Sequence, residues 1–316
     1  MTATRSLPVP LAIGGAVAIG VMTAVQARIN GVLGIRLGDG VVAGLVSFIV
    51  GTVALALIVA ALPTGRAGMA RLAHGIRTRT VPPWMLLGGA CGALTVSTQG
   101  LTAAVLGVSL FTVGVVAGQT VHGLVLDRIG FGPAGVVAVT MGRVAGAALA
   151  LLAVGVSMGG DVLRTAPLWM LVLPFAAGVG IAWQQAANGR LAQRVASPMA
   201  ATMTSFIAGT LVLAVAATVS VLVQGAPHAL PAEPWLYLGG FLGVVYIFLG
   251  AFLVAHTGVL LLGLGSVLGQ LVAAVVIDMF WPTEAGPAAW QIVTMVVIAV
   301  ASVLVALARR RPERHR

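Results

Sequence analysis

The stretch that decides the fold is VQARINGVLGIRLGDGVVAGLVSFIVGT, residues 25–52, because the chain repeats it as WQQAANGRLAQRVASPMAATMTSFIAGT, residues 183–210. The two stretches align without a gap at an offset of 158, and eleven of the 28 aligned positions are identical. Several identical positions carry polar side chains, so a shared apolar composition does not explain the match. The chain therefore contains an internal repeat.

A second pair of stretches supports this interpretation, because residues 83–127 align on residues 234–278 at an offset of 151. Both stretches begin with Pro-Trp, continue through a Gly-Gly pair and a Gly-Gln pair, and end on an aspartate. The two offsets differ because the Arg-rich connection after residue 62 is the longer one. We predict a duplicated unit, with one repeat at residues 1–160 and the other at residues 161–316.

The composition indicates an integral membrane protein. Of 316 residues, 59% are hydrophobic and 8% are charged, and the mean hydropathy is +1.10, whereas a soluble protein has roughly 25% charged residues. Apolar runs of about 20 residues recur, each long enough to cross a bilayer as a helix. The first run could also be read as a signal peptide, but polar residues shared with the repeat favour a retained helix. We predict an all-α polytopic fold of ten transmembrane helices, at about 9–30, 40–62, 83–104, 107–126, 134–157, 167–189, 198–222, 234–255, 258–280 and 287–308.

The topology follows from the number of spans. Five spans per repeat is an odd number, so the second repeat must insert upside down relative to the first. Thirteen arginines fall on the side of the two termini, against two or three on the other side: Arg36, Arg164 and, if it lies beyond the first span, Arg28. Because basic residues mark the cytoplasmic side, we expect both termini in the cytoplasm of a cell-membrane protein. Inverted repeats are typical of transporters, whose site lies near the midplane where the repeats meet.

The motifs resemble those of a known family. The pattern Q-x3-N-G, S-F-I-x-G-T, P-W with G-G-x2-G, and G-Q with a span-ending D resembles the YdcZ-type inner-membrane exporters of the drug/metabolite transporter superfamily. The resemblance covers almost the whole chain and implies a ten-helix, five-plus-five inverted-repeat fold. The small multidrug resistance transporters, shorter relatives, export cations with a glutamate in the middle of their first helix. Neither span 1 nor span 6 carries a carboxylate here, which argues against proton-coupled export of organic cations.

Polar side chains inside the predicted spans are the candidates for substrate binding, because amides at that depth tend to face the bundle interior or a cavity. Structural roles stay open: an interhelical hydrogen bond for the glutamines, or a helix end for the asparagines that precede glycine. His122 could serve proton coupling or be a structural residue. The candidates are Gln26, Asn30, Gln99, Gln119, His122, Gln184, Asn188, Tyr246 and Gln270.

Small residues at helical spacing are the candidates for helix packing and gating. Gly-x3-Gly pairs let helix backbones approach closely, and serine and glycine in the SFIxGT stretches form a narrow strip on one helix face. The span-ending aspartates oppose their helix dipoles, so we interpret them as structural or gating contacts rather than substrate ligands. These candidates are Ser47, Gly51, Gly114, Gly118, Asp127, Ser205, Gly209, Gly265, Gly269 and Asp278.

We therefore predict a secondary transporter that exports a small metabolite or drug-like molecule by alternating access. The alternatives are a lipid or polyprenyl-carrier flippase and a membrane scaffold subunit without flux of its own. The sequence shows no nucleophile–base pair, metal-ligand cluster or nucleotide loop, so we predict no enzyme, no cofactor and no metal. The expected partners are the lipid bilayer and a small-molecule substrate. A homodimer is left open, and nucleic acid is excluded because the net charge of +10 comes from arginines placed by topology.

Overall fold

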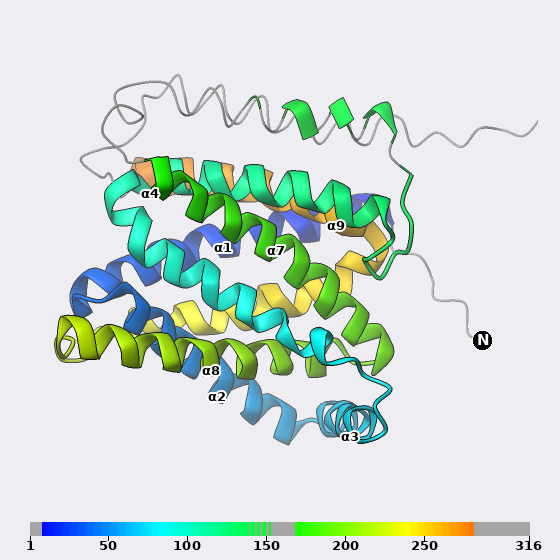
Figure 1. Cartoon of the computed structure of the whole chain (residues 1–316), viewed down its shortest axis with the longest axis horizontal. Coiled ribbons are helices and arrows are strands. Elements are labelled where there is room, and N and C mark those ends of the chain that lie inside the picture. Colours follow the sequence, from blue (N-terminus) through cyan, green and yellow to red (C-terminus); the bar gives the residue numbers. More distant parts are fainter. Residues whose placement is uncertain are drawn as a thin grey trace, which may run out of the picture.

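The structure is a computed structural model that describes residues 8–138, 140–142, 144–145, 147–149, 152 and 168–280 (Figure 1). The helices of the first half are α1 (Val9–Leu37), α2 (Gly40–Ala61), α3 (Pro63–Arg77), the 3₁₀ turn η1 (Pro83–Leu87) and α4 (Gly88–Arg128). Those of the second half are α7 (Leu168–Arg194), α8 (Pro198–Gln224), the 3₁₀ turn η2 (Pro234–Tyr237) and α9 (Leu238–Phe280). The predicted tenth span and part of the fifth lie outside the described residues.

Helix α1 continues past its predicted end. We expected α1 to stop near residue 30, where Asn30 precedes a glycine, but its helical turns continue to Leu37. The residue that ends α1 is Gly38, whose φ of 70° places it in the left-handed region that glycine adopts without strain. The next residue, Asp39, caps α2 by accepting hydrogen bonds from two backbone amides at its start. Ser197 caps α8 in the same way and is aligned with Asp39 in the repeat.

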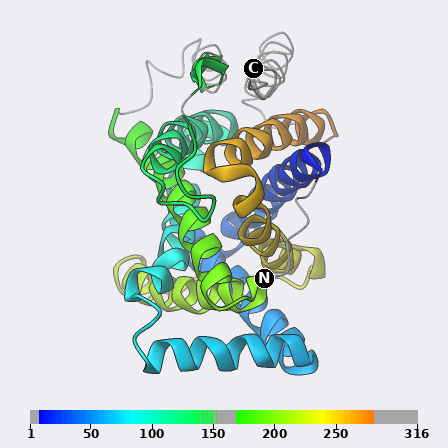
Figure 2. The same cartoon turned by 90° about the vertical axis from the view of Figure 1, so that its right-hand side faces the viewer.

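The Arg-rich connection after residue 62 is also helical, which the sequence analysis did not predict. Pro63 occupies the first turn of α3, where a missing backbone N–H costs least. Gly65, Gly68, Leu72 and Gly75 form its buried face, and the remaining positions are exposed or half-buried. Figure 1 views α3 end-on, and Figure 2 shows it along its length at the outer edge of the bundle.

Each of the two longest helices reverses direction. We predicted two spans joined by a short connection within residues 83–126 and again within residues 234–280. In α9 the connection is a single residue, Gly258, with φ 73° and ψ 170° inside otherwise helical backbone. In α4 the helical residues continue through the turn. Figure 1 shows the two parts of α4 (cyan, then teal) and of α9 (yellow, then orange) running in opposite directions across the view.

Each half packs against the other through its first helix and the last described long helix of the other half. Helix α1 packs along α9, and α7 packs along α4. The closest approach occurs twice, at aligned positions. A Cβ atom added to Gly20 would overlap the carbonyl oxygen of Ser266, and one added to Gly178 would overlap that of Val115. Gly178 is aligned with Gly20, and Ser266 is aligned with Val115. The repeat in the sequence is therefore matched by a repeat in the contacts.

Helices α2 and α8 meet through residues that contact their own repeat partners. The hydroxyl oxygens of Thr52 and Thr210 lie 2.9 Å apart, and the rings of Phe48 and Phe206 have centroids 5.2 Å apart. Each phenyl ring lies over a glycine of the facing SFIxGT stretch: Phe206 over Gly51, and Phe48 over Gly209. Because a Cβ atom at either glycine would overlap a ring, the small residues here are required for packing.

The outer surface of the described helices is apolar. Leu211, Val215, Val219, Leu222 and Val223 are all exposed along α8, and α2 exposes a similar row of aliphatic side chains. A soluble protein rarely exposes an apolar patch of this kind, whereas lipid chains cover one without cost. Among the described residues, four helices are long and apolar enough to cross a membrane: Pro10–Leu37, Gly40–Ala61, Pro198–Gln224 and Pro234–Ala274.

Candidate functional site

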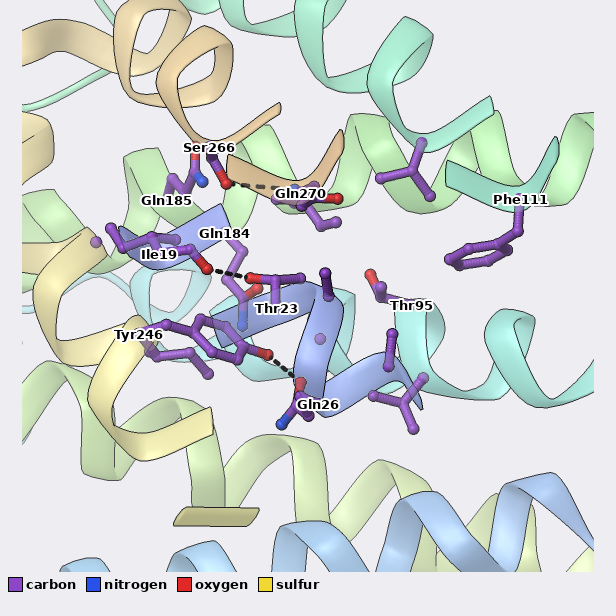
Figure 3. A pocket seen from close by; sticks show the side chains of 18 of the residues that line it. Ile19, Thr23, Gln26, Thr95, Phe111, Gln184, Gln185, Tyr246, Ser266 and Gln270 are labelled. Carbon is purple, nitrogen blue, oxygen red and sulfur yellow. Dashed lines mark hydrogen bonds between the residues drawn. The ribbon is translucent and has the colours of Figure 1, made fainter. Parts of the chain in front are cut away.

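A cavity of about 100 Å³ lies between α1, α4, α7 and α9, so both halves of the chain contribute to its wall (Figure 3). It has room for a few water molecules or a compact solute. Its polar lining residues are Thr23, Gln26, Arg28, Thr95, Gln184, Gln185, Asn188, Tyr246, Ser266 and Gln270. Its larger apolar lining residues are Ile19, Val96, Phe111, Val115, Ile181, Ile247 and Ile277.

The aligned glutamines Gln26 and Gln184 both line this cavity, but their amides differ in how they are held. Gln26 donates from Nε2 to the carbonyl oxygen of Gly239 at 2.7 Å and accepts the Tyr246 hydroxyl at 2.8 Å. Gln184 is only 7% exposed, and its Nε2 has no hydrogen-bond partner among the described residues. Since position 95 in the first copy holds a threonine where the second holds Tyr246, the aligned phenol is missing beside Gln184. One glutamine is therefore fixed by the protein, and the other keeps an unused donor.

Arg28 is a charged cavity residue that the sequence analysis did not include among its candidates. It lies inside α1, four residues after Ala24 and five after Thr23, which also line the cavity. We had counted it with the outer arginines if it lay beyond the first span; it does not, because α1 continues to Leu37. The signal that could have found it was the four-residue spacing from Ala24, which places these two residues on one face of the helix. The aligned residue in the second copy is Ala186, so only one half supplies a charge.

With this geometry established, the chain can be compared with known proteins. A protein-family profile described as "Putative inner membrane exporter, YdcZ" matches residues 11–156 and 169–305, which is most of the chain.

The chain belongs to this YdcZ exporter family.

It is therefore a multi-pass inner-membrane transporter of the drug/metabolite transporter superfamily, with the lipid bilayer and a small-molecule substrate as its partners.

A solved structure named "Crystal structure of protein" is similar to the exporter over 94% of this chain and 96% of its own, with a TM-score of 0.58 and 17% sequence identity. At that identity the likeness concerns the fold alone. A comparison with curated protein sequences gave no significant match.

The exporter's predicted substrate-binding residues divide into three groups. Five line the cavity: Gln26, Gln184, Asn188, Tyr246 and Gln270. Three do not: Asn30, Gln119 and His122. Gln119 is 1% exposed, lies against Gly263 of α9, and neither of its amide atoms has a hydrogen-bond partner among the described residues. The side chain of Gln99 lies outside the described residues.

The predicted packing and gating residues lie at helix contacts. Ser205 donates to Oδ1 of Asn188 at 2.8 Å, which connects the SFIxGT stretch of α8 to a cavity residue on α7. Its partner Ser47 is likewise buried. The Gly-x3-Gly pairs abut facing helices: Gly114 meets Pro174, Gly118 meets Phe175, Gly265 meets Ala16 and Gly269 meets Val17. The side chain of Asp278 lies outside the described residues.

Asp127 connects the end of α4 to the break in α9. Its carboxylate is fully buried and accepts hydrogen bonds from the backbone amides of Val259 and Leu260 at 2.8 and 3.1 Å. These two amides lie at the start of the helical segment that follows Gly258. Asp127 therefore caps this segment in the way that an aspartate at the N-cap position does. Its carboxylate atoms lie within 3.4 Å of the position of a Cβ atom at Gly258, so the tight turn also leaves room for the cap.

Aromatic side chains pack together beside this cap. Phe131, on the loop after α4, packs against Trp84 at 4.9 Å and Trp183 at 6.4 Å between ring centroids. Arg190 holds the same loop, donating to the carbonyl oxygen of Gly130 at 2.6 Å while its guanidinium lies over the Phe131 ring. Phe131 and Trp183 pack against the apolar cluster that includes the cavity residue Ile19. The aromatic cluster therefore lies next to an apolar cluster that contributes to the cavity wall.

Proposed function

We propose that the exporter carries a small solute through this cavity by alternating access, as a secondary transporter built from two inverted five-helix repeats. The observation that carries the proposal is a polar cavity lined from both halves, to which the aligned side chains Gln26 and Gln184 both contribute. A site at the junction of two inverted repeats can face either side of the membrane as the repeats move.

The contacts between repeat partners support the inverted arrangement. Two copies related by a two-fold axis bring equivalent residues together only where the axis passes between them. Thr52 and Thr210 form such a contact, and Phe48 and Phe206 form another. The paired glycine contacts of α1 with α9 and of α7 with α4 follow the same relation. Together with the arginine count, they favour a topology with both termini in the cytoplasm.

The aromatic cluster of Phe131, Trp84 and Trp183 suggests how one gate is built. The loop after α4 lies between Arg128 and Arg190, on the side where most arginines fall, which we propose is cytoplasmic. Release of Phe131 from the two tryptophans would open the cavity toward that side. A scaffold subunit has no need of a buried polar cavity, so the structure favours transport over that alternative.

The aligned pair Gln119 and Gln270 provides the test of this proposal. Gln270 lines the cavity and donates to Ser266 at 3.3 Å, whereas Gln119 is packed away from it. We expect Gln270→Leu to lower solute flux about tenfold, since a site loses one polar contact. We expect Gln119→Leu to preserve flux and to preserve or raise the unfolding temperature, because it removes two amide atoms that are buried without partners.

The measurement is flux into proteoliposomes for a panel of solutes that includes neutral, anionic and cationic molecules. Both variants should have the same helix content and insertion as the wild type, measured by circular dichroism and membrane fractionation. Equal flux in the two variants would show that the cavity is not the pathway. Absence of flux for every solute in the wild type would favour the scaffold alternative.

A further inference from the structure

The charge of the cavity selects among small solutes. Arg28 lines the cavity, and no aspartate or glutamate occurs among its lining residues in the described part of the chain. An ionisable side chain inside a membrane span is costly and marks a functional site by default. In a low-dielectric cavity with a positive wall, an anion is stabilised and a cation is repelled.

We propose that the substrate is a small, largely apolar monocarboxylate whose carboxylate binds Arg28; this inference rests on the proposed transport function and names its substrate class. The planar guanidinium has five N–H donors and matches a carboxylate with two parallel hydrogen bonds. Because the guanidinium has five donors, it can form hydrogen bonds with a partner within the protein and with a solute at the same time. The position is asymmetric, as the aligned residue is Ala186, so a solute with one charged end fits better than a symmetric one.

A second observation, independent of Arg28, points to an acceptor in the cavity. The Nε2 donor of Gln184 is buried, lines the cavity and has no hydrogen-bond partner among the described residues. A buried amide donor left without an acceptor costs about 1–3 kcal/mol, so a bound oxygen would remove that cost. Figure 3 shows Gln184 among the polar side chains that line the cavity. Its aligned partner Gln26 already has both of its amide atoms bonded.

The remainder of the wall indicates what the carboxylate is attached to. Ile19, Phe111, Val115, Ile181 and Ile247 give the cavity an aliphatic and aromatic surface, which suits a hydrocarbon body. Arg28 is the single cation among the lining residues that the structure describes. A phosphate dianion would bring a second charge into the interior without a second cation among the described lining residues, and an uncompensated buried charge is strongly unfavourable. A monocarboxylate is therefore the better match.

Three probes of the same shape and different charge test this inference: benzoate (negative), benzamide (neutral) and benzamidine (positive). Each is added to the purified full-length exporter in detergent, and the unfolding temperature is measured against probe concentration. Benzoate is expected to raise the unfolding temperature most, benzamide less, and benzamidine not at all. An equal or larger shift with benzamide or benzamidine, or no shift with benzoate, would overturn the inference without any variant being made.

Substitutions then assign the effect to the residue. Arg28→Gln is expected to weaken benzoate binding about 10- to 100-fold, the range for a lost charge-assisted bidentate contact. Arg28→Lys keeps the charge and should retain part of the affinity, which separates loss of binding from loss of fold. The matched control is Arg36→Gln on the same helix, whose side chain is 60% exposed and pairs with Glu233 at the surface. It should bind benzoate like the wild type; equal weakening by both Gln variants would contradict a site at Arg28.

The two proposals fail in different ways. Benzoate that binds at Arg28, while no solute of the panel is carried into proteoliposomes, would uphold a carboxylate site at Arg28 and overturn the transport function. Flux of benzamide or benzamidine in preference to benzoate would uphold transport and overturn the substrate class.

Discussion

Replacing Gly20 with alanine is expected to lower the stability of the exporter by about 3 kcal/mol, the upper part of the range for overpacking a close contact. A Cβ atom at this position would overlap the carbonyl oxygen of Ser266 and come within 2.7 Å of the backbone nitrogen of Gln270. Both neighbours are backbone atoms of α9, so no side chain can rotate away, and the two helices must separate. Thr23 on α1 and Gln270 on α9 line the cavity, so solute flux should fall as well.

The measurement is the unfolding temperature of the purified protein in detergent, followed by tryptophan fluorescence. Gly14→Ala is the matched control, because it lies on the same helix and a Cβ atom there meets nothing within 4 Å. The Gly14→Ala substitution should not lower the stability of the protein, since alanine has a higher helix propensity than glycine. Gly178→Ala, at the aligned position, should be as damaging as Gly20→Ala. Equal stability of the Gly20 and Gly14 variants would show that α1 and α9 do not approach as closely as described.

Replacing Asp127 with alanine is expected to cost about 2–4 kcal/mol, because two buried backbone amides lose their acceptor at once. The carboxylate is 0% exposed, so water cannot replace it on the Val259 and Leu260 amides. Asp127→Asn retains an acceptor oxygen and should cost less, although it loses the favourable charge at the start of a helix.

The comparison for this variant is Glu233→Ala. That carboxylate is 40% exposed and pairs with Arg36 at 3.3 Å, and surface ion pairs contribute about 0–1 kcal/mol. Thermal and denaturant unfolding of the three variants in detergent give the ranking. If Asp127→Ala were no less stable than Glu233→Ala, the aspartate would not be the cap that holds the second part of α9.

Much of the fold could be predicted from the sequence because polar and small residues occur at the same positions in both copies of the repeat. The offset of 158 identified Thr52 and Thr210 as equivalent, and the structure places them in contact. Most predicted helix starts were confirmed because proline and capping residues mark them, as at Pro198. Helix ends were predicted less well. The first span was predicted to end near residue 30, but the left-handed residue that ends α1 is Gly38.

The site was harder to predict because helical spacing does not reveal which neighbour a side chain faces. Gln119 and Gln270 are equivalent in the sequence, yet only Gln270 lines the cavity, since the neighbours of the two residues differ between the copies. Arg28 was missed because its depth depends on where α1 ends. These differences arise because the side chains differ between the two halves. An alignment of the two copies shows which residues are equivalent but not which neighbours each one contacts.

The central claim is that the two halves of the exporter are inverted, and the accessibility of aligned residues tests it most directly. After the single cysteine Cys91 is replaced by serine, Arg36→Cys and Arg194→Cys each introduce one thiol at an exposed, aligned position. A membrane-impermeant maleimide is applied to right-side-out and to inside-out vesicles. The account predicts that the thiol at position 36 reacts only in right-side-out vesicles and the thiol at position 194 only in inside-out vesicles. Reaction of both thiols from the same side would contradict it.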